Sequence, residues 1–245
     1  MNKKHIISTI NQKGGVGKTT TAINLAHGFA QKNFQTLFLD LDPQGNATSI
    51  WDPDNQSEST IYPAFMDKIP VQKLVQKSNL HDLLDYVPAS LQLAETESLL
   101  AGSLDGFFRL SDTLQGLDYD LIIIDCPPSL SILTINALVA STGIIIPIQI
   151  SKFSIDGIQT ILDTVGSIKN RYNHSLTIHG ALVTFYNPRP TIAEYLPVFD
   201  TKISQSVSVE EAHLFQKTLY NYKKNSKPAK EYQNLVEEML HVIQR

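Results

Sequence analysis

The sequence is poor in cysteine, with only Cys126 among its 245 residues. No disulfide can form within the chain, and this composition is typical of proteins from a reducing compartment. No stretch approaches the roughly 18 apolar residues of a membrane-spanning helix, and the short apolar run near the N-terminus is too brief for a signal peptide. These absences predict a soluble, cytoplasmic protein.

The chain also lacks a strong charge of either sign, because 20 Lys and Arg residues face 24 Asp and Glu residues. Binding to nucleic acid would therefore require a local basic patch. The seven histidines show no metal-ligand spacing, and the nucleophile motif G-x-S-x-G is absent. We expect neither a transition-metal site nor a serine hydrolase.

Short apolar runs alternate with longer helical patterns along the chain. The runs are HIISTI, TLFLDLD, DLIIIDCPP, GIIIPIQI and LTIHGALVTFY, and helices are expected over residues 18–31, 91–100, 131–140, 155–171 and 229–242. Unbroken apolar strands separated by helices predict an α/β fold, a mostly parallel twisted sheet with helices on both faces. With no repeat or linker, we expect residues 1–245 to form one domain.

The segment QKGGVGKTT (12–20) connects the first expected strand to the first expected helix. It differs from the usual phosphate-loop pattern G-x-x-x-x-G-K-[ST], because Gln12 replaces the first glycine and Lys13 precedes the others. Backbone N–H groups of such a loop can wrap phosphates, and the helix N-terminus adds positive potential. Lys18 would then reach the β- and γ-phosphates, and Thr19 would ligate Mg²⁺. An ordinary glycine-rich turn explains the same residues less well.

Three motifs together resemble those of the ParA/MinD family of deviant Walker A ATPases. KGGVGKTT resembles the deviant Walker A loop, LFLDLDPQGNATS (37–49) the Walker A′ and first switch region, and DLIIIDCPPS (120–129) the Walker B strand and second switch. The resemblance extends at least to TFYNPRPTIAEYL (184–196) and is closest to short ParA-type partition ATPases. It implies a P-loop NTPase fold and a Mg²⁺-dependent ATP hydrolase.

The resemblance also implies that two subunits form a homodimer around two ATP molecules. In that arrangement Lys13 reaches the phosphates held by the other subunit, much as an arginine finger does. Without the family motif, Lys13 reads as a solvated lysine at a strand end. Asn187 lies where the family contacts adenine, although a turn-forming asparagine before Pro188 explains it almost equally well. The expected nucleotide-binding residues are Lys13, Gly14, Gly15, Val16, Gly17, Lys18, Thr19, Thr20 and Asn187.

Three aspartates lie at the ends of expected strands. Asp40 and Asp42 are separated by one residue and share a face, and Asp125 ends the apolar run LIIID. By resemblance Asp42 orients the attacking water, while Asp40 and Asp125 join Thr19 around Mg²⁺. The expected catalytic residues are Lys13, Lys18 and Asp42. Alternatively one acid caps a following helix, which is more credible for Asp40 than for Asp125.

The family resemblance implies partition of plasmid or chromosomal DNA with a ParB-like adaptor. Family members often carry a stretch like I-P-R-N-V-R-L-x-E-A, whereas residues 203–212 read ISQSVSVEEA, with Gln205 and Ser208 in place of the arginines. A lysine cluster near Tyr220 and Tyr222 is the remaining candidate for non-specific DNA binding, or else a solvated helix face. It comprises Lys217, Lys223, Lys224, Lys227 and Lys230.

Two alternatives to DNA partition stay open. The protein could position a protein assembly with weak DNA binding, or act as a nucleotide-bound scaffold with little hydrolysis. The C-terminal segment YQNLVEEMLHVIQR is amphipathic but acidic on its polar side, which disfavours a membrane-targeting helix. No winged-helix segment precedes the first strand, so operator-specific repression is not expected. DNA binding would make the protein nucleoid-associated.

Overall fold

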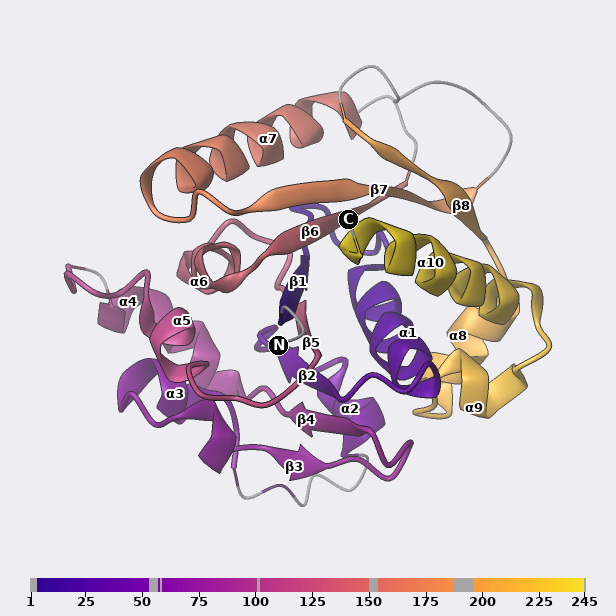
Figure 1. Cartoon of the computed structure of the whole chain (residues 1–245), viewed down its shortest axis with the longest axis horizontal. Helices are drawn as coiled ribbons and strands as arrows, with labels where there is room; N and C mark the ends of the chain where they lie inside the picture. The colour runs from indigo at the N-terminus through magenta and orange to yellow at the C-terminus, as the bar shows by residue number, and fades with distance from the viewer. Residues whose placement is uncertain are drawn as a thin grey trace.

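The computed structural model describes residues 4–52, 57, 59–100, 102–149, 154–186 and 196–244. An eight-stranded sheet in the order β3-β4-β2-β5-β1-β6-β7-β8 runs through the middle of the fold (Figure 1). Its strands are β1 (His5–Thr9), β2 (Thr36–Asp40), β3 (Gln76–Lys77), β4 (Leu84–Val87), β5 (Leu121–Asp125), β6 (Gly143–Gln149), β7 (Thr177–Tyr186) and β8 (Val198–Ser204).

Only the short edge strand β3 is antiparallel to its neighbour, and the remaining neighbours pair in parallel. Parallel strands require crossover connections, and most of these contain helices. The helices are α1 (Lys18–Gln31), α2 (Thr48–Trp51), α3 (Tyr62–Met66), α4 (Thr96–Leu100), α5 (Arg109–Thr113), α6 (Ile132–Ala140), α7 (Ser154–Arg171), α8 (Val207–Leu214), α9 (Leu219–Lys223) and α10 (Lys227–Ile243), with 3₁₀ turns η1 (Val71–Lys73) and η2 (Leu91–Glu95).

Successive residues of the central strands enter two different hydrophobic cores, one on each face of the sheet. Ile122 and Ile124 of β5 pack in the core under α3, α5, α6 and α7, while Ile123 packs in the core under α1 and α10. A strand buried on both faces is apolar at every position, which explains the unbroken runs in the sequence. The prediction of a mostly parallel sheet covered on both faces is confirmed (Figure 1).

One predicted helix is partly wrong. Residues 91–95 form the 3₁₀ turn η2, and only residues 96–100 form the α-helix α4. Leu93 N–H bonds Ser90 O three residues back, and the tighter turn places buried Leu93 and Thr96 on the same side. The elements β8, α8 and α9 were not predicted, and residues of β8 and α8 line the cavity described below. Among the described helices, none combines the length and apolarity needed to cross a membrane.

Candidate functional site

The glycine loop lies between β1 and α1, at the edge where the parallel strands end. Gly15 and Gly17 have φ angles of 72° and 83°, a left-handed conformation that favours glycine. Gly17 is the N-cap of α1, and no side chain within the described chain caps that helix end. The free N–H groups of the first turn and the helix dipole therefore face the loop, which is the arrangement that binds anions.

Gly14 does not have this left-handed conformation, so its backbone does not require glycine. A Cβ atom built on Gly14 meets no other atom within 4 Å, and the same is true of Gly15. Lys13 beside them is exposed, and its backbone N–H donates to Asn11 Oδ1 at 2.9 Å. The outer surface of the loop is thus open, with a lysine at its mouth.

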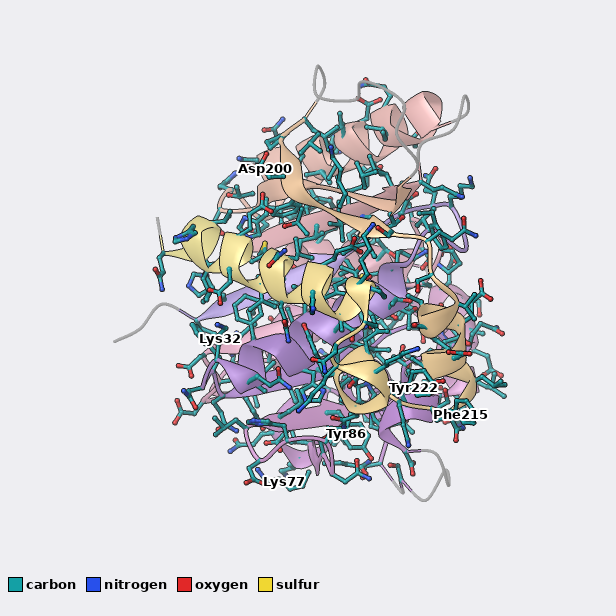
Figure 2. The ribbon with its side chains drawn as sticks, turned by 90° about the vertical axis from the view of Figure 1, so that its right-hand side faces the viewer. Lys32, Lys77, Tyr86, Asp200, Phe215 and Tyr222 are labelled. Carbon is teal, nitrogen blue, oxygen red and sulfur yellow. The ribbon has the colours of Figure 1, made fainter. Side chains whose placement is uncertain are left out.

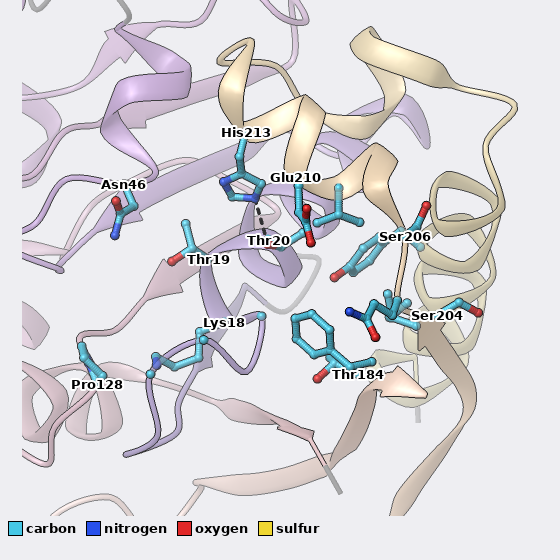
Figure 3. A pocket seen from close by; sticks show the side chains of 18 of the residues that line it. Lys18, Thr19, Thr20, Asn46, Pro128, Thr184, Ser204, Ser206, Glu210 and His213 are labelled. Carbon is cyan, nitrogen blue, oxygen red and sulfur yellow. Dashed lines mark hydrogen bonds between the residues drawn. The ribbon is translucent and has the colours of Figure 1, made fainter. Parts of the chain in front are cut away.

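Lys18 folds back over the loop instead of extending into solvent (Figure 3). Its side chain is only 6% exposed, and Nζ donates to Lys13 O at 3.1 Å. Burial lowers the pKa of Lys18, while the Asp125 and Asp42 carboxylates raise it. A buried ammonium group beside open backbone N–H groups makes the inside of the loop strongly attractive to phosphate.

Asp125 ends β5 and is fully buried. One carboxylate oxygen, Oδ1, accepts from Thr9 Oγ1 at 3.2 Å, whereas buried Oδ2 has no hydrogen-bond partner among the described residues. Burial raises the pKa of Asp125, and Asp40 raises it further, against the opposing effects of Thr19 and Lys18. A buried carboxylate oxygen without a partner is costly, and a hydrated cation would satisfy it.

These surroundings fit Mg²⁺ rather than a metal held by the protein alone. Among the described residues, no group of three or more His, Cys, Asp or Glu side chains could hold a metal ion. Mg²⁺ keeps several waters and usually takes only one or two protein carboxylates together with substrate phosphates. Asp125 and the Thr19 hydroxyl at the start of α1 are suited to such a site.

Asp40 is held differently from Asp125, although the two are register partners in adjacent strands. Its Oδ1 accepts from the Asp42 N–H at 3.0 Å, and its Oδ2 accepts from Thr48 N and Thr48 Oγ1 at 2.8 and 2.7 Å. Both oxygens are thus engaged, and they hold the first residue of α2. This geometry favours the alternative in which Asp40 caps a helix, and a place for Asp40 near Mg²⁺ stays a prediction.

Asp42 lies just beyond β2 and is 7% exposed. Its Oδ1 accepts from the Gln44 N–H at 3.0 Å, which fixes the carboxylate in place. Asp42 also lines a cavity with Lys18 and Thr19. A fixed, ionisable oxygen facing the cavity can orient a water molecule there. Cys126, next to Asp125, is buried and free, and burial raises the pKa of its thiol.

The cavity has a volume of about 500 Å³ and extends from the glycine loop to α8 (Figure 3). One end is lined by the loop, Asp42 and Pro128. The other is lined by residues of β7, β8, α8 and α10 and of the turn between β8 and α8, namely Thr184, Phe185, Ile203, Ser204, Gln205, Ser206, Val209, Glu210, His213 and Tyr232. A polar, cationic end and a partly apolar end suit a ligand with phosphates and a ring system.

Hydrogen bonds tie the two sides of the cavity together. Thr20 Oγ1 and His213 Nε2 are 2.9 Å apart, the dashed line in Figure 3. Thr184 Oγ1 donates to the carbonyl oxygen of Val16, a buried loop residue, at 2.9 Å. The wall made by residues 203–213 was missed by sequence reasoning. Glu211 and Ala212 match the family stretch I-P-R-N-V-R-L-x-E-A, but this match does not place the segment beside the glycine loop.

The lysines predicted to contact DNA do not line the cavity. Asn187 falls outside the described residues. The five lysines are exposed on the segment from the end of α8 to the start of α10, and none lines the cavity. Tyr220 is buried and only 6% exposed, so of the two tyrosines only Tyr222 accompanies the lysines towards the surface.

Comparison with known proteins gives consistent similarities. The family model described as "AAA domain" matches residues 4–178. The chain is 38% identical to "Chromosome partitioning protein ParA" of Myxococcus xanthus (strain DK1622), covering 96% of this chain and 87% of that protein. It is 36% identical to "Sporulation initiation inhibitor protein Soj" of Bacillus subtilis (strain 168), covering 96% and 97%.

Solved structures give the same picture. A putative plasmid partition protein from Borrelia burgdorferi bound to AMPPNP superposes with a TM-score of 0.84 at 27% identity, covering 98% of this chain and 99% of that one. Cobyrinic acid a,c-diamide synthase from Mycobacterium smegmatis, with a bound ATP analog and magnesium, superposes with a TM-score of 0.83 at 27% identity, covering 98% and 95%.

Proposed function

Because the chain belongs to the ParA/Soj family of partition ATPases, we propose that it is a Mg²⁺-dependent ATP hydrolase acting in DNA partition. The observation that carries this proposal is the glycine loop, with an uncapped helix N-terminus and the buried Lys18 beside it. We further propose that residues 1–245 work as one ATPase domain in the cytoplasm.

ATP and Mg²⁺ are the proposed ligands of the cavity. Lys18 and the loop N–H groups bind the phosphates, while Thr19 and Asp125 hold the ion and its waters. When bound, Mg²⁺ supplies positive charge that offsets the charge developing on the phosphates. The ATP analog and magnesium in the synthase structure of similar fold support this choice.

Asp42 is proposed to orient the attacking water. Its carboxylate is fixed by the Gln44 N–H and faces the cavity near the end that binds phosphate. A positioned carboxylate of this kind holds the water in line with the bond to be broken. Asp40 supports this role indirectly, because its Oδ1 accepts the Asp42 N–H.

The active form is proposed to be a homodimer that encloses two ATP molecules. Lys13 is exposed at the mouth of the loop, and the space beyond Gly14 and Gly15 is open. A second subunit can approach this surface, and its Lys13 would then reach the phosphates bound here. This explains why the loop carries two lysines, one for each subunit's nucleotide.

A ParB-like adaptor and non-specific DNA are the proposed partners. Exposed lysines from 217 to 230 supply the positive charge for DNA phosphates. A second candidate function, positioning a protein assembly with weak DNA binding, is favoured by Gln205 and Ser208 where relatives often carry arginine. The third candidate function is a scaffold that binds nucleotide and hydrolyses it only slightly.

The test is ATP turnover measured with Mg²⁺ alone, with duplex DNA, and with DNA plus the adaptor encoded nearest the gene. Partition predicts slow turnover that DNA and adaptor together stimulate. Stimulation by a protein partner without DNA supports the second candidate. Tight ATP binding without turnover under every condition supports the scaffold, and absence of nucleotide binding refutes all three.

A further inference from the structure

The helix that follows the glycine loop presents three polar side chains on one face. Thr20, Asn24 and His27 are four and three residues apart, the spacing that aligns side chains along an α-helix. Each of them is hydrogen-bonded to the segment from the last turn of α8 to the first residue of α9, His213–Leu219. We call these contacts the polar seam, and its members are Thr20, Asn24 and His27 of α1 with His213, Thr218 and Leu219.

Two of the seam's bonds lie in the interior. Leu219 N–H donates to Asn24 Oδ1 at 3.0 Å, and His27 Nδ1 is 2.9 Å from Thr218 Oγ1. Asn24, His27 and Thr218 are each at most 2% exposed. Buried hydrogen bonds are directional and costly to leave unmade. The seam therefore fixes the position of this segment along α1 more strictly than apolar contacts would.

The seam's histidines act as neutral hydrogen-bonding groups. Burial and, to a smaller extent, the neighbouring His81 lower the pKa of His27 to about 4. Burial also lowers the pKa of His213. Neither ring carries a charge near neutral pH, so the seam acts through the fixed geometry of its hydrogen bonds rather than through charge.

One end of the polar seam lies at the cavity, and the other end lies at α9, the helix that ends at Lys223. Thr20 and His213 line the cavity. At the other end, the Thr218 hydroxyl caps α9 by accepting from the Asn221 N–H at 3.3 Å. The same hydroxyl that meets His27 thus orients the helix that ends at Lys223.

The outer side of α8 and α9 combines exposed apolar and basic groups. Leu214 and Phe215 are 78% and 57% exposed, and the Phe215 ring stacks on Tyr222 with centroids 5.5 Å apart. Figure 2 shows these two aromatic residues close together at the edge of the molecule. Lys217 and Lys223 are exposed on the same segment. These exposed cations complement an anionic partner such as the DNA backbone.

We propose that the polar seam couples nucleotide in the cavity to DNA binding by the lysines around α9, with Thr218 as a positioning residue. The DNA part of this inference rests on the proposed function. A shift of the first turns of α1 on nucleotide binding moves the segment bonded to it, and with it Lys217 and Lys223. By linkage, the factor by which ATP strengthens DNA binding equals the factor by which DNA strengthens ATP binding.

The test compares Thr218→Val, which removes the hydroxyl at nearly constant volume, with Thr218→Ser, which keeps it. Affinity for a labelled duplex is measured by anisotropy with and without Mg²⁺ and a non-hydrolysable ATP analogue, and nucleotide affinity with and without duplex. We expect Thr218→Val to reduce both coupling factors by about fivefold, the size of one hydrogen bond. Thr218→Ser keeps them, and nucleotide affinity without DNA is unchanged. A folded Thr218→Val protein with wild-type coupling refutes the seam.

A second measurement uses the unmodified protein, in case Thr218→Val does not fold. The nucleotide analogue with Mg²⁺ should change amide hydrogen exchange in a peptide covering residues 218–223, none of which lines the cavity. Unchanged exchange refutes the coupling. If the wild type binds no DNA in any nucleotide state, the DNA clause of the proposed function fails, while the exchange result still decides whether the seam responds to nucleotide.

Discussion

Lys18 keeps an ammonium group in a buried place, although burial lowers its pKa. Among the described residues, its ammonium group donates to the carbonyl oxygen of Lys13, a weak substitute for an anion. The uncapped N–H groups at the start of α1 lie beside it. At the scale of single residues, the site is therefore arranged around a negative ligand that the protein itself does not supply.

Lys18→Ala should abolish measurable ATP binding, because it removes the cation facing the β- and γ-phosphates. A charged hydrogen bond contributes roughly 1.5–3 kcal/mol, so we expect at least a tenfold loss of affinity in calorimetry. Lys32→Ala is the matched control, since exposed Lys32 follows the other end of α1 and pairs with Glu237. Equal affinity of Lys18→Ala and the wild type would overturn the phosphate-loop assignment.

Asp42→Ala should leave ATP binding intact and stop hydrolysis, because only the oriented water is lost. The protein should then accumulate as an ATP-bound dimer in size-exclusion chromatography, with turnover lowered by roughly 100-fold or more. Asp118→Ala, at an exposed acid outside the cavity, should behave like the wild type. Normal turnover by Asp42→Ala, with a monomer in the presence of ATP, would exclude the assigned role.

At the scale of elements, the sequence predicted α1 fully and the wall opposite it not at all. The ends of α1 are marked locally, by Gly17 at its start and by Asn33, with a left-handed φ of 66°, just after its end. In β8 only Phe199 and Ile203 are buried, and in α8 only Ala212. Such segments carry no continuous apolar pattern.

The position of that wall depends on bonds between distant residues. Ser204 at the end of β8 donates through N and Oγ to Glu231 of α10, at 2.8 and 2.6 Å. His213 meets Thr20 across 193 positions of sequence. Pairs of residues this far apart leave no periodic pattern in the sequence, so this half of the cavity could not be predicted. The aspartates at the carboxyl ends of β2 and β5 could be placed together, because parallel strands in a sheet end at one edge.

The buried His27 should make the packing of α1 sensitive to acid. Burial and, to a smaller extent, the neighbouring His81 lower its pKa to about 4. Below the ordinary histidine pKa of 6.5, the imidazole binds a proton in the unfolded chain but stays neutral in the folded chain. Stability is therefore full above about pH 6.5 and falls as the pH decreases towards 4, by roughly 3 kcal/mol for His27.

Urea unfolding between pH 7 and 4.5 measures this loss. His27→Gln keeps a polar group near Thr218 but does not titrate, so its stability should depend less steeply on pH than that of the wild type. His174→Gln is the control, because His174 is exposed and should keep the wild-type slope. A slope unchanged by His27→Gln would mean that this ring titrates normally in the folded protein.

At the scale of the whole molecule, the open loop predicts a partner subunit. Lys13→Ala should slow hydrolysis and weaken the ATP-dependent dimer while ATP still binds the monomer, because the phosphate it contacts lies in the other subunit. Gly14→Val tests the same surface, since a side chain there meets nothing within 4 Å in one chain. It should leave the melting temperature without nucleotide nearly unchanged and block dimer formation.

Analytical ultracentrifugation with and without ATP separates these effects. A Gly14→Val protein that melts far below the wild type would show that the glycine serves the fold of the single chain. Wild-type dimerisation and turnover by Lys13→Ala would remove the argument that one subunit supplies a lysine to the other. The loop would then carry its first lysine only as a solvated strand-end residue.

DNA binding by the dimer depends on how many phosphates its lysines neutralise. Two subunits place two lysine segments on one particle, and each phosphate contact adds about −0.9 to the slope of log affinity against log salt. Lys223→Glu combined with Lys224→Glu should therefore lower both affinity and slope, with ATP turnover in the absence of DNA unchanged. The control, Lys73→Glu with Lys169→Glu, makes the same charge change at exposed sites on η1 and α7.

Binding curves with ATP at several salt concentrations decide whether the lysine segment contacts DNA or is only a solvated face. If both double variants lose affinity equally, only net charge matters. If the wild type binds no DNA even at low salt, the loss of the family arginines at Gln205 and Ser208 has not been offset, and positioning of a protein assembly becomes the favoured function.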